Sequence, residues 1–157
     1  MTLAFTEPTT PMHHPDPTLD RQFYDGVPSR RLIAWFLDAV VIFVMFAVAA
    51  LAFGILTLGL GFFAAPLIFM ASGFVYRVVM LSTASATFGM KMTGIEFRDV
   101  HGQRFAFGTA FLHTLAYSLI FTSGLFQVAS CLAILMTEKG QSIPDLLLGT
   151  VAINKPL

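Results

Sequence analysis

The amino-acid sequence predicts an all-α transmembrane helical bundle with two full spans, a third apolar segment and a small cytoplasmic β element. Composition is the first reason: 56% of the 157 residues are hydrophobic and 11% are charged, whereas a soluble domain carries about 25% charged residues. The second reason is two long runs without charge, residues 39–76 and 105–137. Because the mean hydropathy is also high, at +0.77, the chain is expected to lie in a lipid bilayer.

The first apolar run predicts two membrane-spanning helices. A transmembrane helix needs about 20 apolar residues, so residues 39–76 and their flanks provide one helix at about 31–54 and a second at about 60–82. The stretch GILTLGLG at 54–61 lies between them. Its glycines suit a tight turn because glycine tolerates the backbone conformations that a short reversal needs.

The second apolar run is 33 residues long, which is too long for one ordinary span and too short for two full ones. Two interpretations are open for the segment 106–137. It is either a single bent helix, or a hairpin broken near Thr122–Ser123–Gly124, where small and polar residues interrupt the apolar pattern.

Basic residues predict the orientation of the chain, because cytoplasmic flanks and loops are enriched in Lys and Arg. Those beside the first helix and in the central loop are Arg30, Arg31, Lys91, Arg98 and Arg104. The N-terminus and the central loop are therefore expected in the cytoplasm, and Lys139 and Lys155 extend this expectation to the C-terminus. Two cytoplasmic termini require an even number of crossings, which favours the broken hairpin; an odd number is the alternative.

The chain is expected to divide into a tail and one membrane domain. Residues 1–28 contain five prolines and four acidic residues, a composition that predicts a disordered cytoplasmic tail. Residues 29–157 form the membrane domain, which includes a loop and strand region at 83–105 and a C-terminal capping segment at 138–157.

Two stretches outside the apolar runs alternate polar and apolar residues, the period of a half-buried strand. The first, GIEFRDVHGQRFAF at 94–107, predicts a strand pair with a turn at His101–Gly102, and TVAIN at 150–154 predicts another strand. If these strands form one sheet, they lie on the same face of the membrane, which is a second reason to expect a cytoplasmic C-terminus.

Three charged residues fall within the first two predicted spans. Arg31 and Asp38 are seven positions apart and share one helix face, and Arg77 is the third. A lone carboxylate in hydrocarbon costs roughly 2.5 to 3.5 kcal/mol, and in an antiparallel hairpin Asp38 and Arg77 lie at similar depths. We therefore expect an Asp38–Arg77 ion pair. The alternatives are that Arg77 extends to the membrane interface, and that Asp38 binds an ion or titrates.

The stretch QSIPDLLLG at 141–149 predicts a short helix. Ser142 and Asp145 have the spacing of a capping box, Pro144 suits a first turn and Gly149 suits a stop. Asp145 is thus either a helix-start acid or a second carboxylate available to Arg31.

Three stretches resemble a known family, the RDD family of small bacterial multi-pass membrane proteins. The resemblance covers about residues 28–154, and the stretches that carry it are RLIAWFLD (31–38), TFGMKMTG (87–94) followed by DVHG (99–102), and DLLLGT (145–150).

The family takes its name from one arginine and two aspartates, which the resemblance places at Arg31, Asp38 and Asp145. Many relatives carry an arginine early in the third apolar segment, where this chain has His113, and a histidine can be neutral at physiological pH. The resemblance implies a location in the bacterial cytoplasmic (inner) membrane with the N-terminus in the cytoplasm, and transport of an unidentified ligand or ion.

Two functions are open. The first is transport or exchange of a small ion or solute, with Asp38 as the intramembrane carboxylate. Because two or three spans can hardly enclose a pathway, this function requires a homo-oligomer or a membrane partner. The second is a non-transporting scaffold or accessory subunit in which the Arg/Asp triad is structural.

Catalysis is not expected, because the sequence contains no HExxH, GxSxG or Gly-rich phosphate loop. No cofactor, metal or nucleic-acid partner is expected either, since the four histidines lack ligand spacing and the net charge is zero. Cys131 is the single cysteine, so no internal disulfide is possible.

Overall fold

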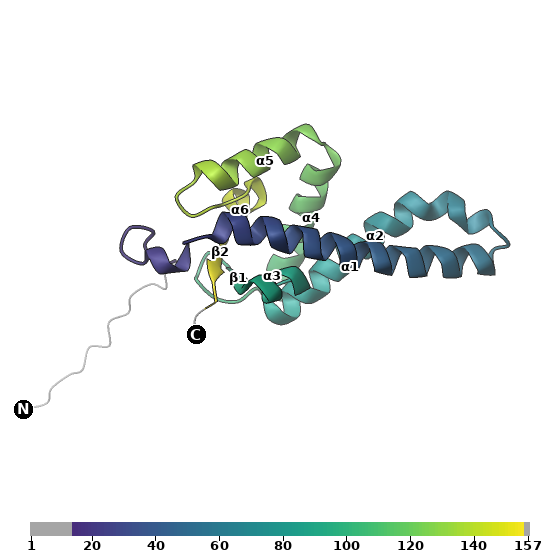
Figure 1. The fold of residues 1–157 in the computed structure, drawn as a ribbon, viewed down its shortest axis with the longest axis horizontal. Coiled ribbons are helices and arrows are strands. Elements are labelled where there is room, and N and C mark those ends of the chain that lie inside the picture. Colours follow the sequence, from purple (N-terminus) through teal and green to yellow (C-terminus); the bar gives the residue numbers. More distant parts are fainter. Residues whose placement is uncertain (1–13, 156–157) are drawn as a thin grey trace, which may run out of the picture.

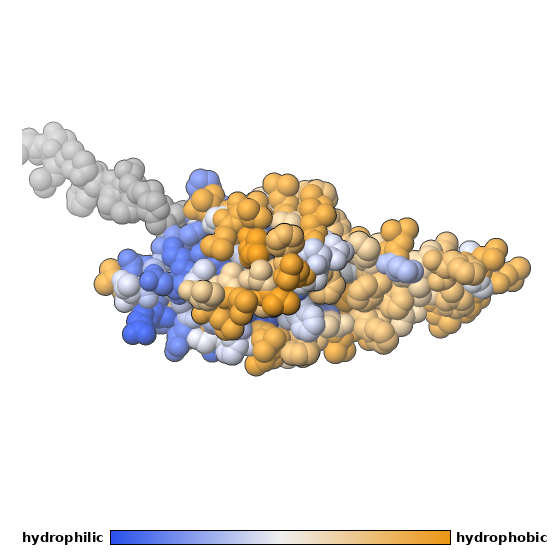
Figure 2. All heavy atoms as spheres, turned by 90° about the horizontal axis from the view of Figure 1, so that it is seen from above, coloured by the Kyte–Doolittle hydropathy of each residue, from blue (hydrophilic) through white to orange (hydrophobic). Residues whose placement is uncertain are grey.

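In the computed structural model, which describes residues 14–155, two long helices form an antiparallel hairpin that projects from the rest of the molecule (Figure 1). Helix α1 spans Val27–Leu56, a short 3-10 helix η2 spans Leu60–Ala64, and α2 spans Ala65–Ala84. Figure 2 shows hydrophobic residues over the projecting hairpin and hydrophilic residues gathered at the opposite end of this face. The molecule is thus polarised along the axis of α1, as a protein with one end in lipid should be.

The other elements collect around the first half of α1 (Figure 1). In chain order they are η1 (Arg21–Phe23), α3 (Phe88–Thr93), β1 (Ile95–Arg98), α4 (Phe107–Thr122), α5 (Leu125–Met136), α6 (Ile143–Leu148) and β2 (Val151–Asn154).

The expected spans are confirmed by length and composition. Both α1 and α2 are long and apolar enough to cross a membrane, and the α4–α5 pair would add a third crossing if it is counted as one span. This pair is bent by 118° at Ser123 and at Gly124, where φ is +61°. The third segment is therefore two helices with a sharp break near the predicted Thr122–Ser123–Gly124, which is either one broken span or a re-entrant loop.

The expected small sheet forms, with one difference. β1 and β2 pair antiparallel, Ile95 opposite Asn154 and Arg98 opposite Val151. The predicted strand after His101–Gly102 is absent from this part of the structure, where residues 103–106 are irregular. The Asp99 carboxylate accepts hydrogen bonds from the backbone N–H groups at 101 and 103, and such local bonds compete with a strand ladder.

Residues 14–28 are ordered against the C-terminal strand. The Asn154 amide donates to the carbonyls of Gln22 at 2.8 Å and Asp25 at 2.9 Å, and the Tyr24 hydroxyl donates to the Pro15 carbonyl at 2.8 Å. The part of the predicted tail at 14–28 thus makes contacts with the rest of the chain, and residues 1–13 lie outside the described residues. The contacts also place the segment before α1 beside β2, as one shared side of the membrane requires.

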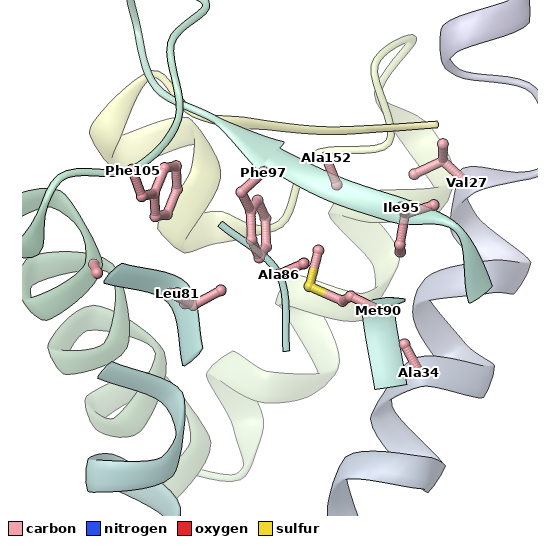
Figure 3. Close-up of a cluster of buried hydrophobic side chains, with 10 residues drawn as sticks. Val27, Ala34, Leu81, Ala86, Met90, Ile95, Phe97, Phe105 and Ala152 are labelled. Carbon is pink, nitrogen blue, oxygen red and sulfur yellow. The ribbon is translucent and has the colours of Figure 1, made fainter. Parts of the chain in front are cut away.

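A small hydrophobic core lies beneath the sheet (Figure 3). Its buried members come from α1, the C-terminal half of α2, α3, α4, both strands and the connections before α3 and α4: Val27, Ala34, Leu81, Ala86, Met90, Ile95, Phe97, Phe105, Ala110 and Ala152. The close approach of α3 to α1 depends on Gly89, because a Cβ atom at this position would lie 2.2 Å from the carbonyl oxygen of Ala34.

We expect Gly89→Ala to lower the free energy of unfolding by about 1–3 kcal/mol, because the new methyl group meets backbone that cannot move aside. The measurement is unfolding in detergent micelles followed by circular dichroism. The matched control is Gly108→Ala, where a Cβ atom would meet nothing within 4 Å. Equal stabilities of the two variants would show that α1 and α3 are not in close contact.

Candidate functional site

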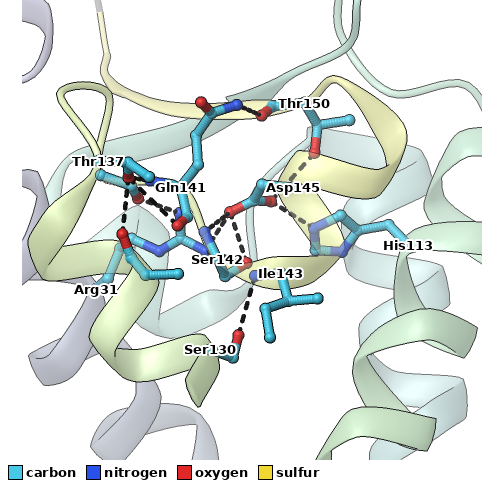
Figure 4. A network of polar contacts seen from close by, with 11 residues as sticks. Arg31, His113, Ser130, Thr137, Gln141, Ser142, Ile143, Asp145 and Thr150 are labelled. Atoms are coloured by element: carbon cyan, nitrogen blue, oxygen red, sulfur yellow. Dashed lines mark hydrogen bonds and ion pairs between the residues drawn. The ribbon is translucent and has the colours of Figure 1, made fainter. Parts of the chain in front are cut away.

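Asp145 is the centre of a buried polar cluster at the start of α6 (Figure 4). One carboxylate oxygen, Oδ2, lies 2.7 Å from Nη2 of Arg31 on α1 and accepts from the Ser142 backbone N–H at 2.9 Å. The other, Oδ1, lies 2.8 Å from Nε2 of His113 on α4 and accepts from the Thr150 hydroxyl at 3.1 Å. An ionised carboxylate only accepts, so Nε2 of His113 carries the donated proton. One side chain thus joins α1, α4 and α6.

The predicted capping box is confirmed and explains why Asp145 lies there. Ser142 is the N-cap of α6, Pro144 is in its first turn, and Gly149 ends it with φ +63°. The same carboxylate therefore caps a helix and neutralises Arg31, so both interpretations of Asp145 apply.

Electrostatics favour the ionised form of Asp145. Its side chain is fully buried, and burial alone raises the pKa of the carboxyl group. The positive charge of Arg31 and the hydrogen bonds from His113 and Ser142 outweigh burial and hold this pKa well below its usual range. Arg31 is itself fixed by hydrogen bonds to the Gly140 carbonyl at 2.9 Å and the Ser142 hydroxyl at 3.2 Å.

Asp38 occupies a separate buried site between α1, α2 and α3. Its Oδ1 accepts from the Tyr76 hydroxyl at 2.6 Å and the Gly89 backbone N–H at 2.8 Å, and its Oδ2 accepts from the Thr87 hydroxyl at 2.6 Å. Among residues 14–155, no cationic side chain forms an ion pair with it. Three neutral donors stabilise this carboxylate instead.

The Asp38 site also completes the N-terminus of α3, whose first N–H groups have no partners within the helix. The Phe88 N–H donates to the Tyr76 hydroxyl at 2.9 Å and the Met90 N–H to the Thr87 hydroxyl at 3.3 Å. The N–H between them, that of Gly89, donates to Asp38. A negative charge at this end is favourable to the helix dipole. Asp38 is therefore a cap supplied by another helix.

The expected ion pair between Asp38 and Arg77 is wrong: no such pair occurs within residues 14–155. The Arg77 guanidinium lies over the Tyr117 ring, 3.9 Å from its centroid. Consecutive residues point about 100° apart around a helix. Tyr76 faces Asp38 and donates to it, and the next residue, Arg77, therefore points in a different direction, toward Tyr117. The side chain of Arg77 is 9% exposed, so it does not extend to a polar surface either.

A cavity of about 820 Å³ separates α5 from α1. Four of the charged or titratable side chains discussed above line it, and they come from α1, α2 and α4: Arg31, Asp38, Arg77 and His113. Asp145 is not among the lining residues and lies behind Arg31 and His113. Two members of the triad thus face this space, and the third supports them.

Comparison with protein families identifies the family of this chain. A family model described as the RDD family matches residues 26–149, most of the chain. The chain belongs to the RDD family. No curated protein and no solved structure matches it. In this RDD-family protein the arginine and the two aspartates form two sites rather than one: Arg31 pairs with Asp145, and Asp38 has its own donors.

Sequence reasoning missed the partners of the two isolated charges. They are Tyr76, Thr87 and Gly89 around Asp38, and Tyr117 beneath Arg77. The stretch TFGMKMTG contained one usable signal, since Thr is a preferred N-cap, but nothing in it shows that α3 faces Asp38. In the part of the chain that the structure describes, no group of three His, Cys, Asp or Glu residues is placed to hold a metal ion.

We expect Asp145→Asn to lower the free energy of unfolding by about 3–5 kcal/mol, because it leaves the mostly buried Arg31 charge without its counter-ion. The measurement is unfolding in detergent micelles. Glu138→Gln removes an exposed carboxylate and is the control, expected within about 0.5 kcal/mol of the unchanged protein. A loss no greater than in the control would contradict a structural role for the pair.

The stability difference between the unchanged protein and Asp145→Asn should depend on pH. The pKa of Asp145 in the folded state lies below its ordinary value of 3.8, so its stabilising contribution is complete above that value and is lost as the pH falls below it. Unfolding measured from neutral pH down to about pH 3 should show the two proteins converging only below about pH 4. A difference that is already shrinking between neutral pH and pH 5 would assign the effect to another group.

Proposed function

We propose that this RDD-family protein moves a small ion or solute across the bacterial cytoplasmic (inner) membrane, with its N-terminus in the cytoplasm, through the cavity between α1 and α5. The observation that carries the proposal is the position of charged residues in this cavity. Placing an ionisable side chain inside a membrane domain costs free energy, and such residues usually mark a path for an ion or a substrate.

The shape of the cavity supports a path. Its lining residues on α1 run from Pro28 to Asp38, which is about 15 Å along a helix. It therefore extends from the polar end of the molecule toward the apolar hairpin. Gln127 and Ser130 of α5 also line it, so polar groups face each other across the space.

The proposal requires an oligomer. Two spans and a bent helix pair surround the cavity on part of its perimeter only, and exposed apolar side chains such as Val40, Val44 and Val48 follow one face of α1. A second copy packed on the membrane-facing side would complete the wall, as small and apolar helix faces permit.

A non-transporting scaffold is the second candidate, and a specific observation favours it. Asp38 and Asp145 have all their oxygens engaged by donors from other elements, which is the arrangement of a structural clamp. This function predicts that Asp38→Asn loses stability without altering any flux.

The test is flux in proteoliposomes, with Na⁺, K⁺, protons and small organic anions as separate probes. Cys131 lines the cavity and is the only cysteine, so a bulky maleimide attached there should block flux. The matched control is Cys131→Ser, whose flux the reagent should leave unchanged. The mass of the purified particle is measured by light scattering on the same preparation.

Three results would contradict the proposal. Absence of flux for every probe favours the scaffold. Flux that survives complete labelling of Cys131 places the path elsewhere. A transporting preparation with the mass of one chain contradicts the oligomer.

A further inference from the structure

Arg77 carries a charge that no described side chain neutralises. Within residues 14–155 no carboxylate forms an ion pair with it, and its Nε atom is buried without a hydrogen-bond partner. The Tyr117 ring covers one face of the guanidinium. Stacking on a ring leaves the edge of the guanidinium free, and all five N–H donors lie on that edge.

The position of Tyr117 is itself fixed. The Trp35 indole N–H donates to the Tyr117 hydroxyl at 3.1 Å, which links α1 to α4 across the cavity wall. Trp35, Arg77 and Tyr117 all line the cavity. The guanidinium is therefore held in place beside the cavity rather than free to swing toward water.

The Asp38 carboxylate does not compete for Arg77. Asp38 lines the same cavity, but its two oxygens already accept three hydrogen bonds, and the shortest of them are 2.6 Å. An incoming cation would have to displace the donors of Tyr76 or Thr87. An incoming anion at Arg77 displaces nothing.

Much of the remaining wall is apolar, although polar side chains such as Gln127 and Ser130 interrupt it. The apolar part includes Leu32, Ala34, Met90, Ile134 and Leu135, which lie on α1, α3 and α5. A ligand that fills such a space gains from burying a hydrocarbon or aromatic body, while a few polar groups fix its orientation. The volume of about 820 Å³ accommodates a body of ten or more carbon atoms, since ligand pockets are typically about 300–1,000 Å³.

We propose that this cavity binds an amphipathic organic anion, whose carboxylate, sulfonate or phosphate group pairs with the Arg77 guanidinium and whose apolar body lies between α1 and α5. The inference rests on the proposed function for its cavity and deepens it by naming the class of ligand. It also replaces the cation that the two aspartates alone would suggest.

The test is equilibrium dialysis of naphthalene-2-sulfonate against the protein in phosphatidylcholine nanodiscs, with empty nanodiscs subtracted. Naphthalene-2-sulfonamide is the matched neutral ligand. We expect the sulfonate to bind at least about tenfold more tightly than the sulfonamide, because a charge-assisted, desolvated hydrogen bond is worth more than a neutral one. Arg77→Gln should remove this preference.

Two further variants keep the test informative. Arg77→Lys preserves the charge and should preserve the preference for the sulfonate even if Arg77→Gln does not fold. Arg30→Gln removes an exposed arginine that donates to the Thr93 carbonyl and should change nothing. Equal binding of the two ligands, or an unchanged preference in folded Arg77→Gln, would overturn the inference.

Adding phosphatidylglycerol to the nanodiscs identifies the source of the anion. Competition with the sulfonate that persists in folded Arg77→Gln would show lipid binding away from the guanidinium and count against the site. Competition that requires Arg77 assigns the site to an anionic lipid, and absence of competition assigns it to a water-soluble anion.

Failure of this inference and failure of the proposed function are distinguishable. Sulfonate binding without flux of any probe would remove transport and leave the anion site. Flux of Na⁺, K⁺ or protons without preferential sulfonate binding would leave transport and remove the anion site.

Discussion

The buried carboxylate of Asp145 makes the interaction on which the architecture at the polar end of the molecule depends. Helix α6 has six residues, and a helix this short is not stable alone in water. Its attachment comes from the Arg31 ion pair at 2.7 Å and the His113 contact at 2.8 Å. β2 follows directly after α6 and pairs with β1, so the position of the sheet is linked to the same carboxylate.

Asp38 shows a second solution to the same physical problem. A buried carboxylate must be paired or hydrogen-bonded, and Asp145 is both, whereas Asp38 is only hydrogen-bonded, by Tyr76, Thr87 and Gly89. Because neutral donors suffice for Asp38, the positive charge of Arg77 has no negative partner among the described residues. The charge imbalance inside the cavity is a consequence of how α3 is capped.

The sequence predicted the features that local physics decides. The two spans, the break near Gly124, the capping box at Ser142 and the pairing of β1 with β2 all follow from composition, periodicity and turn residues. The predicted Asp38–Arg77 pair was wrong because it used only the depth of the two residues in the membrane. Depth does not decide which way a side chain points around its helix, and on α2 it is Tyr76 that points toward Asp38. The contacts of the segment before α1 were missed because their partner, Asn154, lies far away in the sequence.

The two sites also constrain how the cavity can change shape. Helix α5 lies on one side of it, and the Ser130 hydroxyl on α5 accepts from the Ile143 N–H at the start of α6 at 3.1 Å. Because α6 is fixed to α1 through Asp145 and Arg31, α5 cannot move away from α1 at this end without breaking that bond or displacing the ion pair. The opposite end of α5, after the bend at Gly124, has no such tie to α6. Widening of the cavity is therefore easier toward the apolar end, where Arg77 and Tyr117 lie, than at the Arg31 end.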